Sequence, residues 1–328
     1  MQRREFITLL SGAAVWPISA HAQQRRRVPR VGVLWHAGSA EEEGPYFIAL
    51  QQALNALGYI DGRTIALEYR YPNEEPDRFA SMAAELAASN VEVLVAVTTL
   101  SAMAAQRATM TIPIVFVLVP DPVGIKLVNS LARPGGNVTG LTNTSSDLSA
   151  KRLELFKETF PRITRVALLV NANDQRNTKR YIDETKTAAT KLGIDVQPVE
   201  ARSTGDFEQV FDKVVEASLE GVVVVPDGIF YQGRTSLAQS ALTRRLPLMV
   251  FNRETLQAGG LMSYGVDPRA ILRRAAAYVD KLLKGETAAD LPVEQPTKFE
   301  FLINLKTAKA LGLEISPILL TRADEVIE

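Results

Sequence analysis

A tryptophan and a histidine stand side by side at Trp35-His36, directly after the short apolar run RVGVLW. The chain's other tryptophan and histidine, Trp16 and His21, lie in an N-terminal segment that has the pattern of a cleavable leader. The pair would therefore hold the only residues of either type in a processed chain. Histidine is a general base and a metal ligand, whereas tryptophan offers a flat surface for stacking. The pair thus suggests either catalysis or ligand binding.

The other residues that could support catalysis are missing from the sequence. The chain has no cysteine, and one histidine after the leader cannot supply the usual ligands of a zinc site. We find no GxxxxGK(S/T) phosphate loop, no GxGxxG after the first apolar run and no GxSxG nucleophile turn. A hydrolase built on two carboxylates stays open. We therefore expect a binding protein and not an enzyme, with no catalytic residue, no metal and no cofactor.

The overall charge favours a small or neutral partner. The 328 residues contain 37 Lys and Arg and 37 Asp and Glu, so the formal net charge is zero. A chain without excess positive charge has no general attraction for nucleic acid or for an anionic membrane. We expect a small-molecule ligand, no nucleic acid and a monomer. The lack of cysteine also excludes a lipid-modified cysteine, so we expect no membrane anchor.

Residues 1–22 have the features of an export signal. Two arginines at positions 3 and 4 precede an apolar run, which ends in the small-residue motif Ala20-His21-Ala22. The paired arginines followed by Phe6 resemble a twin-arginine signal, with general secretion as the alternative route. A buried N-terminal helix is opposed by the polar stretch QQRRR that follows. We expect cleavage near Ala22 and a periplasmic protein.

Short apolar runs alternate with helical patterns along the rest of the chain. Because the runs lack polar alternation, they indicate parallel strands covered on both faces by helices. We predict an α/β protein with two sheets of four to six strands, linked near residues 140, 265 and 295. The predicted strands are 30–35, 64–71, 91–97, 112–119, 137–142, 165–170, 194–199, 221–225, 247–251 and 261–265, and the tail after residue 296 adds another strand and a short helix.

Ligands of open parallel sheets bind beyond the carboxyl ends of the strands. The loops at those ends supply the candidate ligand-binding residues, which are Trp35, His36, Ser39, Thr98, Thr99, Ser101, Asp121, Asn171, Asn173, Asp227 and Tyr264.

Each candidate also has a structural explanation. The hydroxyl groups at 98–101 either cap the next helix or help its free N–H groups hold a carboxylate. Asp121 lies between two prolines, which is typical of a turn. Asp227 either caps a helix or pairs with a ligand ammonium. Asn171 and Asn173 either stabilise a turn or contact the ligand, and Tyr264 either packs in the hinge or contacts the ligand.

Three segments resemble one known family. They are DPVGIKLVNSLARPGGNVTGLTN at 121–143, the opening RVGVLWHAGS, and the tail KFEFLINLKTAKALGLEISPILLTRADEVIE. They resemble the ABC-transporter substrate-binding proteins that include the tryptophan/tyrosine-type binders. The resemblance implies a type I periplasmic-binding fold, with two Rossmann-like lobes of parallel sheets joined by a three-crossover hinge. It also implies an ABC permease and an ATPase as partners.

This fold divides the chain into two lobes around a ligand cleft. The N-terminal lobe is expected to comprise 30–141 plus 266–296, and the C-terminal lobe 142–265 plus 297–328. The expected function is that of the solute-binding component of an ABC importer, which captures an amino acid or aromatic acid by lobe closure. The alternative is a sensor that signals to a membrane kinase or chemoreceptor. A LacI-like effector domain is opposed by the leader and by the lack of a helix-turn-helix before residue 30. Trp35-His36 is then interpreted as part of a binding mouth.

Overall fold

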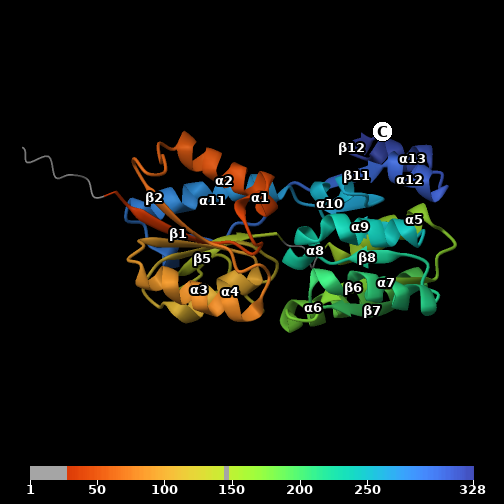
Figure 1. The fold of residues 1–328 in the computed structure, drawn as a ribbon, viewed down its shortest axis with the longest axis horizontal. Helices are drawn as coiled ribbons and strands as arrows, with labels where there is room; N and C mark the ends of the chain where they lie inside the picture. The colour runs from red at the N-terminus through yellow and green to blue at the C-terminus, as the bar shows by residue number, and fades with distance from the viewer. Residues whose placement is uncertain (1–27, 144–147) are drawn as a thin grey trace, which may run out of the picture.

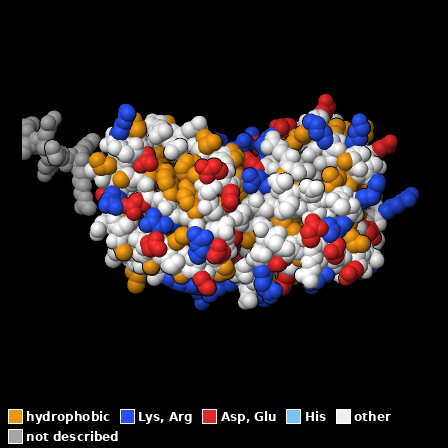
Figure 2. All heavy atoms as spheres, in the orientation of Figure 1, with side chains coloured by type: hydrophobic (Ala, Val, Ile, Leu, Met, Phe, Trp, Pro, Cys, Tyr) orange, Lys and Arg blue, Asp and Glu red, His pale blue; other side chains and the backbone are white. Residues whose placement is uncertain are grey.

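The computed structural model describes residues 28–143 and 148–328 (Figure 1). The expected signal peptide at 1–22 lies outside the described residues. The described chain forms two lobes that lie side by side along the longest axis, each built on its own sheet. Basic and acidic side chains are interspersed on the face drawn in Figure 2, which fits the zero net charge.

The first lobe contains a fully parallel sheet in the order β2-β1-β3-β4-β5. Helices α2 and α11 cover one face of this sheet, and α3 and α4 cover the other (Figure 1). The elements of this lobe are β1 (Arg30–Leu34), α1 (Ala40–Glu43), α2 (Pro45–Ala56), β2 (Ala66–Arg70), α3 (Pro76–Ala88), β3 (Val93–Val97), α4 (Thr99–Ala108), β4 (Ile114–Val119), β5 (Val138–Thr142), α11 (Pro268–Leu283) and η2 (Ala288–Asp290).

Strand β3 shows why an unbroken apolar run forms an inner strand. All five of its residues are buried. Val93, Val95 and Val97 pack in the cluster under α2 and α11, whereas Leu94 and Ala96 pack against α3 and α4. Successive side chains point to opposite faces, so a strand between two helix layers needs apolar residues at every position.

The second lobe repeats this strand order and extends it. Its sheet runs β12-β11-β10-β9-β8-β6-β7, and β11 alone pairs with its neighbour β10 in the antiparallel direction. Its elements are α5 (Ser149–Thr159), β6 (Arg165–Asn171), α6 (Gln175–Leu192), β7 (Asp195–Ala201), η1 (Thr204–Asp206), α7 (Phe207–Glu216), β8 (Val222–Val224), α8 (Gly228–Gln232), α9 (Arg234–Thr243), β9 (Leu248–Val250), α10 (Arg253–Gln257), β10 (Met262–Gly265), β11 (Glu300–Asn304), α12 (Leu305–Leu311), α13 (Pro317–Arg322) and β12 (Glu325–Ile327).

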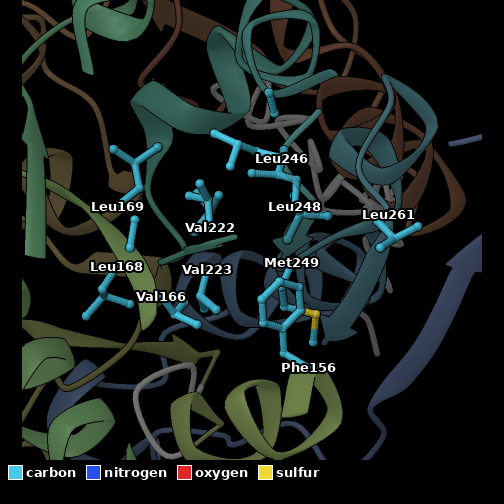
Figure 3. Packing of buried hydrophobic residues seen from close by; sticks show 14 of the residues in the cluster. Phe156, Val166, Leu168, Leu169, Val222, Val223, Leu246, Leu248, Met249 and Leu261 are labelled. Atoms are coloured by element: carbon cyan, nitrogen blue, oxygen red, sulfur yellow. The ribbon is translucent and has the colours of Figure 1, made fainter. Parts of the chain in front are cut away.

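The core of this lobe joins α5 to the middle of the sheet. Phe156 from α5 lies among the side chains of β6, β8 and β9, including Val166, Val223 and Met249 (Figure 3). Gly221 makes room for this ring, because a Cβ atom there would lie 2.6 Å from a ring carbon of Phe156.

The predicted α/β class with two largely parallel sheets is confirmed. The second sheet has seven strands, more than the predicted maximum of six, because the C-terminal tail contributes β11 and β12. The chain passes between the sheets after β5, after β10 and before β11. Within residues 28–143 and 148–328, no helix has both the length and the apolar character needed to cross a membrane.

Candidate functional site

A cavity lies between the two lobes, at the carboxyl ends of the strands of both sheets. About 70 Å³ of it is open to the centre of a water molecule, several times the roughly 10–15 Å³ that one water needs. Its lining consists of His36, Tyr46, Glu74, Thr98, Thr99, Leu100, Leu118, Pro120, Asn143, Asp174, Asn177, Pro226, Asp227, Gly228, Tyr231, Phe251, Asn252, Val266 and Pro268. The site therefore depends on both lobes.

His36 lies between two carboxylates in the wall of the first lobe. Its Nε2 is 3.2 Å from Oε2 of Glu43 and its Nδ1 is 2.8 Å from Oε1 of Glu74. Burial by itself lowers the pKa of His36, but the two carboxylates outweigh this effect and raise it to about 10. The imidazole is therefore protonated at neutral pH, and its charge is already matched by Glu43 and Glu74.

Two further carboxyl groups face this set from the second lobe. Asp227 caps α8 and accepts hydrogen bonds from Asn171 Nδ2 at 2.8 Å and from the N–H of Ile229 at 3.1 Å. Burial, followed by the charges of Glu74 and Asp174, raises the pKa of Asp227 to about 8. Burial also raises the pKa of Asp174, which caps α6.

The cavity has an excess of acidic groups. Among the described residues that line it, none is a lysine or an arginine. Its one histidine is paired with carboxylates, so Asp174 and Asp227 face the cavity with amide and backbone donors only. Such a cavity favours a ligand that brings a positive charge, because an ammonium relieves repulsion among buried carboxylates.

Aromatic and aliphatic groups form the rest of the wall. The rings of Tyr46 and Tyr231 stack with their centroids 4.4 Å apart and their planes at 19°. Phe251, Val266 and Leu118 add apolar surface. A ligand with an apolar or aromatic body would be desolvated against these groups.

The backbone around the cavity is strained at three lining residues. The backbone φ angles of Thr98, Glu74 and Leu118 are 75°, 55° and 63°, values that residues other than glycine seldom adopt. Thr98 stands at the start of α4, and its N–H donates to the carbonyl of Val117. The Oγ1 atom of Thr99 accepts a hydrogen bond from Asn177 of the second lobe at 2.8 Å.

The structure brings four of the eleven candidate residues to the cavity wall: His36, Thr98, Thr99 and Asp227. A fifth, Asn171, lies behind Asp227 and donates to its carboxylate. The other six are not among the lining residues, and each has a structural partner elsewhere.

Trp35 differs most from expectation. It was expected to stack on a ligand, but its side chain is fully buried in the first lobe and lies 5.9 Å from the ring of Phe47. It shares a core cluster with Val33 and Val31, two and four positions earlier, whose side chains point to the same face of the sheet. Ser101 donates its hydroxyl to the carbonyl of Trp35 at 2.8 Å.

The remaining candidates stabilise loops or join elements. Ser39 caps α1. Asp121 accepts from the N–H of Gly124 and forms an ion pair with Arg180 of the second lobe. Asn173 donates to the carbonyl of Arg202 at 2.8 Å, and the ring of Tyr264 lies 6.2 Å from that of Phe299.

Several lining residues were missed by the sequence reasoning. Glu74 follows β2 and Asp174 follows β6, so the rule of strand carboxyl ends could have found both. Tyr46 and Tyr231 lie inside helices, where their spacing looks like that of core residues. No local signal identifies these two tyrosines.

Comparison with known proteins gives one family over most of the chain. The model of the family described as ABC transporter substrate binding protein matches residues 46–327. The tyrosine-binding protein of Clostridioides difficile (strain R20291) is 28% identical over 264 residues, which cover 80% of this chain and 75% of that protein.

Solved structures share the two-lobe architecture. The ABC domain from Streptococcus pneumonia in complex with L-Trp has a TM-score of 0.84 at 25% identity, covering 92% of this chain and 100% of its own. The ligand-free, open structure of a substrate-binding protein with adhesive properties from Clostridium difficile has a TM-score of 0.64 at 24% identity, covering 92% and 99%. The type I periplasmic-binding fold is confirmed.

Proposed function

Because this chain belongs to the family of ABC transporter substrate-binding proteins, as the resemblance in its sequence predicted, we propose that it captures an aromatic amino acid for an ABC importer. The observation that carries the proposal is the cavity between the lobes, whose wall combines acidic groups with aromatic rings. An aromatic amino acid has an ammonium that can pair with the acidic groups and a ring that can pack against the aromatic residues.

The ammonium is proposed to lie against Asp227, close to Glu74 and Asp174. Asp227 already accepts two hydrogen bonds, yet burial holds its pKa near 8, so it lacks a cationic partner. A charge-assisted hydrogen bond from an ammonium would supply that partner. The ammonium would thereby link the acidic residues of the two lobes.

The carboxylate of the ligand is proposed to lie at the start of α4, near Thr98 and Thr99. The first N–H groups of a helix have no partner within the helix, and the helix dipole favours an anion there. The aromatic side chain would then pack against Tyr46, Tyr231 and Phe251. The names of the two relatives, a tyrosine binder and a complex with L-Trp, support this ligand class.

Capture is proposed to occur by closure of the lobes. Residues of both lobes line the cavity, so a ligand that touches both favours the closed arrangement. The higher TM-score with the L-Trp complex than with the open, ligand-free structure supports a closed arrangement in this chain. The lobes also meet across the face in Figure 2 without a continuous gap.

The leader supports a place for this capture outside the cytoplasm. Residues 1–22 would direct export, and the processed chain would work in the periplasm and deliver the amino acid to a membrane permease driven by an ATPase. The cavity itself supplies binding groups, and we propose no reaction there.

Calorimetry with matched ligands tests the proposal. The chain without residues 1–22 is titrated with L-tyrosine, L-tryptophan and L-phenylalanine, and then with tyramine and 3-(4-hydroxyphenyl)propionate. We expect binding of at least one of the amino acids and a large loss with the propionate, which lacks the ammonium. Equal affinity for the propionate and L-tyrosine would contradict the ammonium site. The absence of binding by all three amino acids would contradict the ligand class.

A further inference from the structure

We propose that Tyr46 and Tyr231 form a clasp between the lobes, which sets how long the closed form persists and thereby the affinity for ligand. The inference rests on the proposed capture by closure. Besides the ligand contact proposed above, the two tyrosines are positioning residues in this scheme, because they also hold the lobes together.

The two rings come from opposite lobes. Tyr46 belongs to α2 of the first lobe, and Tyr231 belongs to α8 of the second. Their centroids lie 4.4 Å apart with an interplanar angle of 19°, and both side chains are buried. A stacked aromatic pair of this kind stabilises a contact beyond the apolar area that it buries. The stack exists only while the lobes are closed.

The two hydroxyl groups reach across the interface in opposite directions. The hydroxyl of Tyr46 donates to Oε2 of Glu254 at 3.0 Å and accepts from Nδ2 of Asn252 at 3.0 Å, both in the second lobe. The hydroxyl of Tyr231 donates to the backbone carbonyl of Glu43 in the first lobe at 2.8 Å. Each tyrosine is therefore bonded to the lobe to which it does not belong.

The protonation of Tyr46 suits this donor role. Burial and then the charge of Glu254 raise the pKa of Tyr46 well above its usual value. The phenol consequently stays protonated and donates to the carboxylate over the whole physiological pH range. A hydrogen bond to a charged acceptor in a buried interface is among the stronger ones in proteins.

The clasp opposes a repulsion built into the same interface. Glu74 of the first lobe faces Asp227 and Asp174 of the second lobe. The charge of Glu74 raises the pKa of Asp227, and the charge of Asp174 raises the pKa of Glu74. Without a ligand, the clasp favours closure and the carboxyl groups oppose it. An ammonium in the cavity replaces this repulsion by its own attraction to the carboxylates. A modest contribution from the clasp then shifts the population of the chain strongly towards the closed form.

Glu254 offers a test that does not alter the cavity wall. It bonds to Tyr46 but is not among the lining residues. Glu254→Ala removes the acceptor, and Glu254→Gln keeps an oxygen for the same hydroxyl. Tyr59→Phe is the matched control, because the hydroxyl of Tyr59 donates to Asp280 at 2.9 Å within the first lobe.

The variants are compared by stopped-flow binding of L-tyrosine and by small-angle X-ray scattering. We expect Glu254→Ala to weaken affinity about tenfold, the equivalent of roughly 1.4 kcal/mol, chiefly through faster dissociation. Its ligand-free radius of gyration should exceed that of the unaltered chain, and the two should agree at saturating L-tyrosine. Glu254→Gln should recover most of the loss, and Tyr59→Phe should change neither measurement.

The proposal fails if Glu254→Ala scatters like the unaltered ligand-free chain, or if its affinity loss lies in association alone. If Glu254→Ala does not fold, the double variant Tyr46→Phe with Tyr231→Phe provides the same comparison, because both rings can still stack. The ligand-free scattering needs no bound amino acid. It therefore tests the clasp even if L-tyrosine fails to bind and the proposed ligand class is wrong.

Discussion

Gly228 of the second lobe approaches Glu74 of the first so closely that a Cβ atom on Gly228 would overlap Oε1 of Glu74. The same atom would lie 2.9 Å from Nδ1 of His36. Glu74 cannot easily move aside, because the protonated His36 holds its carboxylate at 2.8 Å. Closure of the cavity therefore requires a residue without a side chain at position 228.

Gly228→Ala should hold the lobes apart while leaving each lobe folded. We expect affinity for L-tyrosine to fall about 5- to 150-fold, since overpacking at a closed interface costs roughly 1–3 kcal/mol. Calorimetry gives the affinity, and scattering of the amino-acid-saturated protein gives the lobe arrangement. Gly205→Ala is the control, because the nearest atom to its added Cβ is Ser203 Oγ at 3.6 Å. Unchanged affinity in Gly228→Ala would contradict the required close approach.

The ligand-free chain should lose stability as the pH rises from about 4 to about 8. The pKa of Asp227 rises from 3.8 to about 8 on folding, so between these values the folded state keeps a proton that the unfolded state has released. The free energy of unfolding then falls with pH. Asp227→Asn, which keeps an oxygen for Asn171 and Ile229, should flatten this dependence and stabilise the chain at pH 8 by about 1 kcal/mol or more. Urea unfolding at a series of pH values measures the free energy of unfolding of both proteins, and the two curves should converge near pH 4. Curves that stay parallel would contradict the raised pKa of Asp227.

Binding of an amino acid should release a proton below pH 8. Asp227 is largely protonated there in the empty cavity, and an ammonium beside it favours the carboxylate. Affinity for L-tyrosine should therefore increase as the pH rises from 6 to 8. Calorimetry at pH 6.5 in phosphate and in Tris, which differ in ionisation enthalpy, measures the released proton. Asp227→Asn should show no such buffer dependence, and a buffer-independent heat in the unaltered chain would exclude this proton.

Thr98→Gly should stabilise the folded chain by about 1 kcal/mol. Thr98 has φ 75° and ψ 171°, a region that is nearly restricted to glycine and costs a β-branched residue about 1–3 kcal/mol. The free energy gained by relief of this strain exceeds the entropic cost of the greater flexibility that glycine brings to the unfolded chain. Urea unfolding should show the gain, whereas Thr111→Gly, at an exposed residue without a positive φ, should destabilise. A loss of stability in Thr98→Gly would mean that its side chain contributes more than its backbone costs.

The strands and the location of the cavity were predictable from the sequence because both follow from local patterns. The run VEVLVAV is apolar at nearly every position and is short, which is typical of a strand covered on both faces. The carboxyl ends of such strands meet at one edge of a sheet. This rule brought His36, Thr98, Thr99 and Asp227 into the set of candidates, and all four line the cavity.

The direction of individual side chains was not predictable in the same way. Trp35 and His36 are adjacent, yet one enters the core and the other the cavity wall, because neighbouring residues at a strand end point to different sides. Tyr46 and Tyr231 meet only when two lobes come together. Nothing within α2 or α8 specifies which face of the helix the other lobe will cover.

The position of α11 in the chain has a consequence for biosynthesis. This helix packs beside α2 on the first sheet, but it is made only after the five parallel strands of the second sheet. The first sheet has all its strands at residue 142, and α2 already covers part of this face, but more than a hundred further residues precede the helix that covers the rest. At roughly 5–20 residues per second, the ribosome takes about 6–30 s to supply them. During that interval the part of the face that α11 covers stays open, so the first lobe is completed only after the parallel strands of the second sheet have been made.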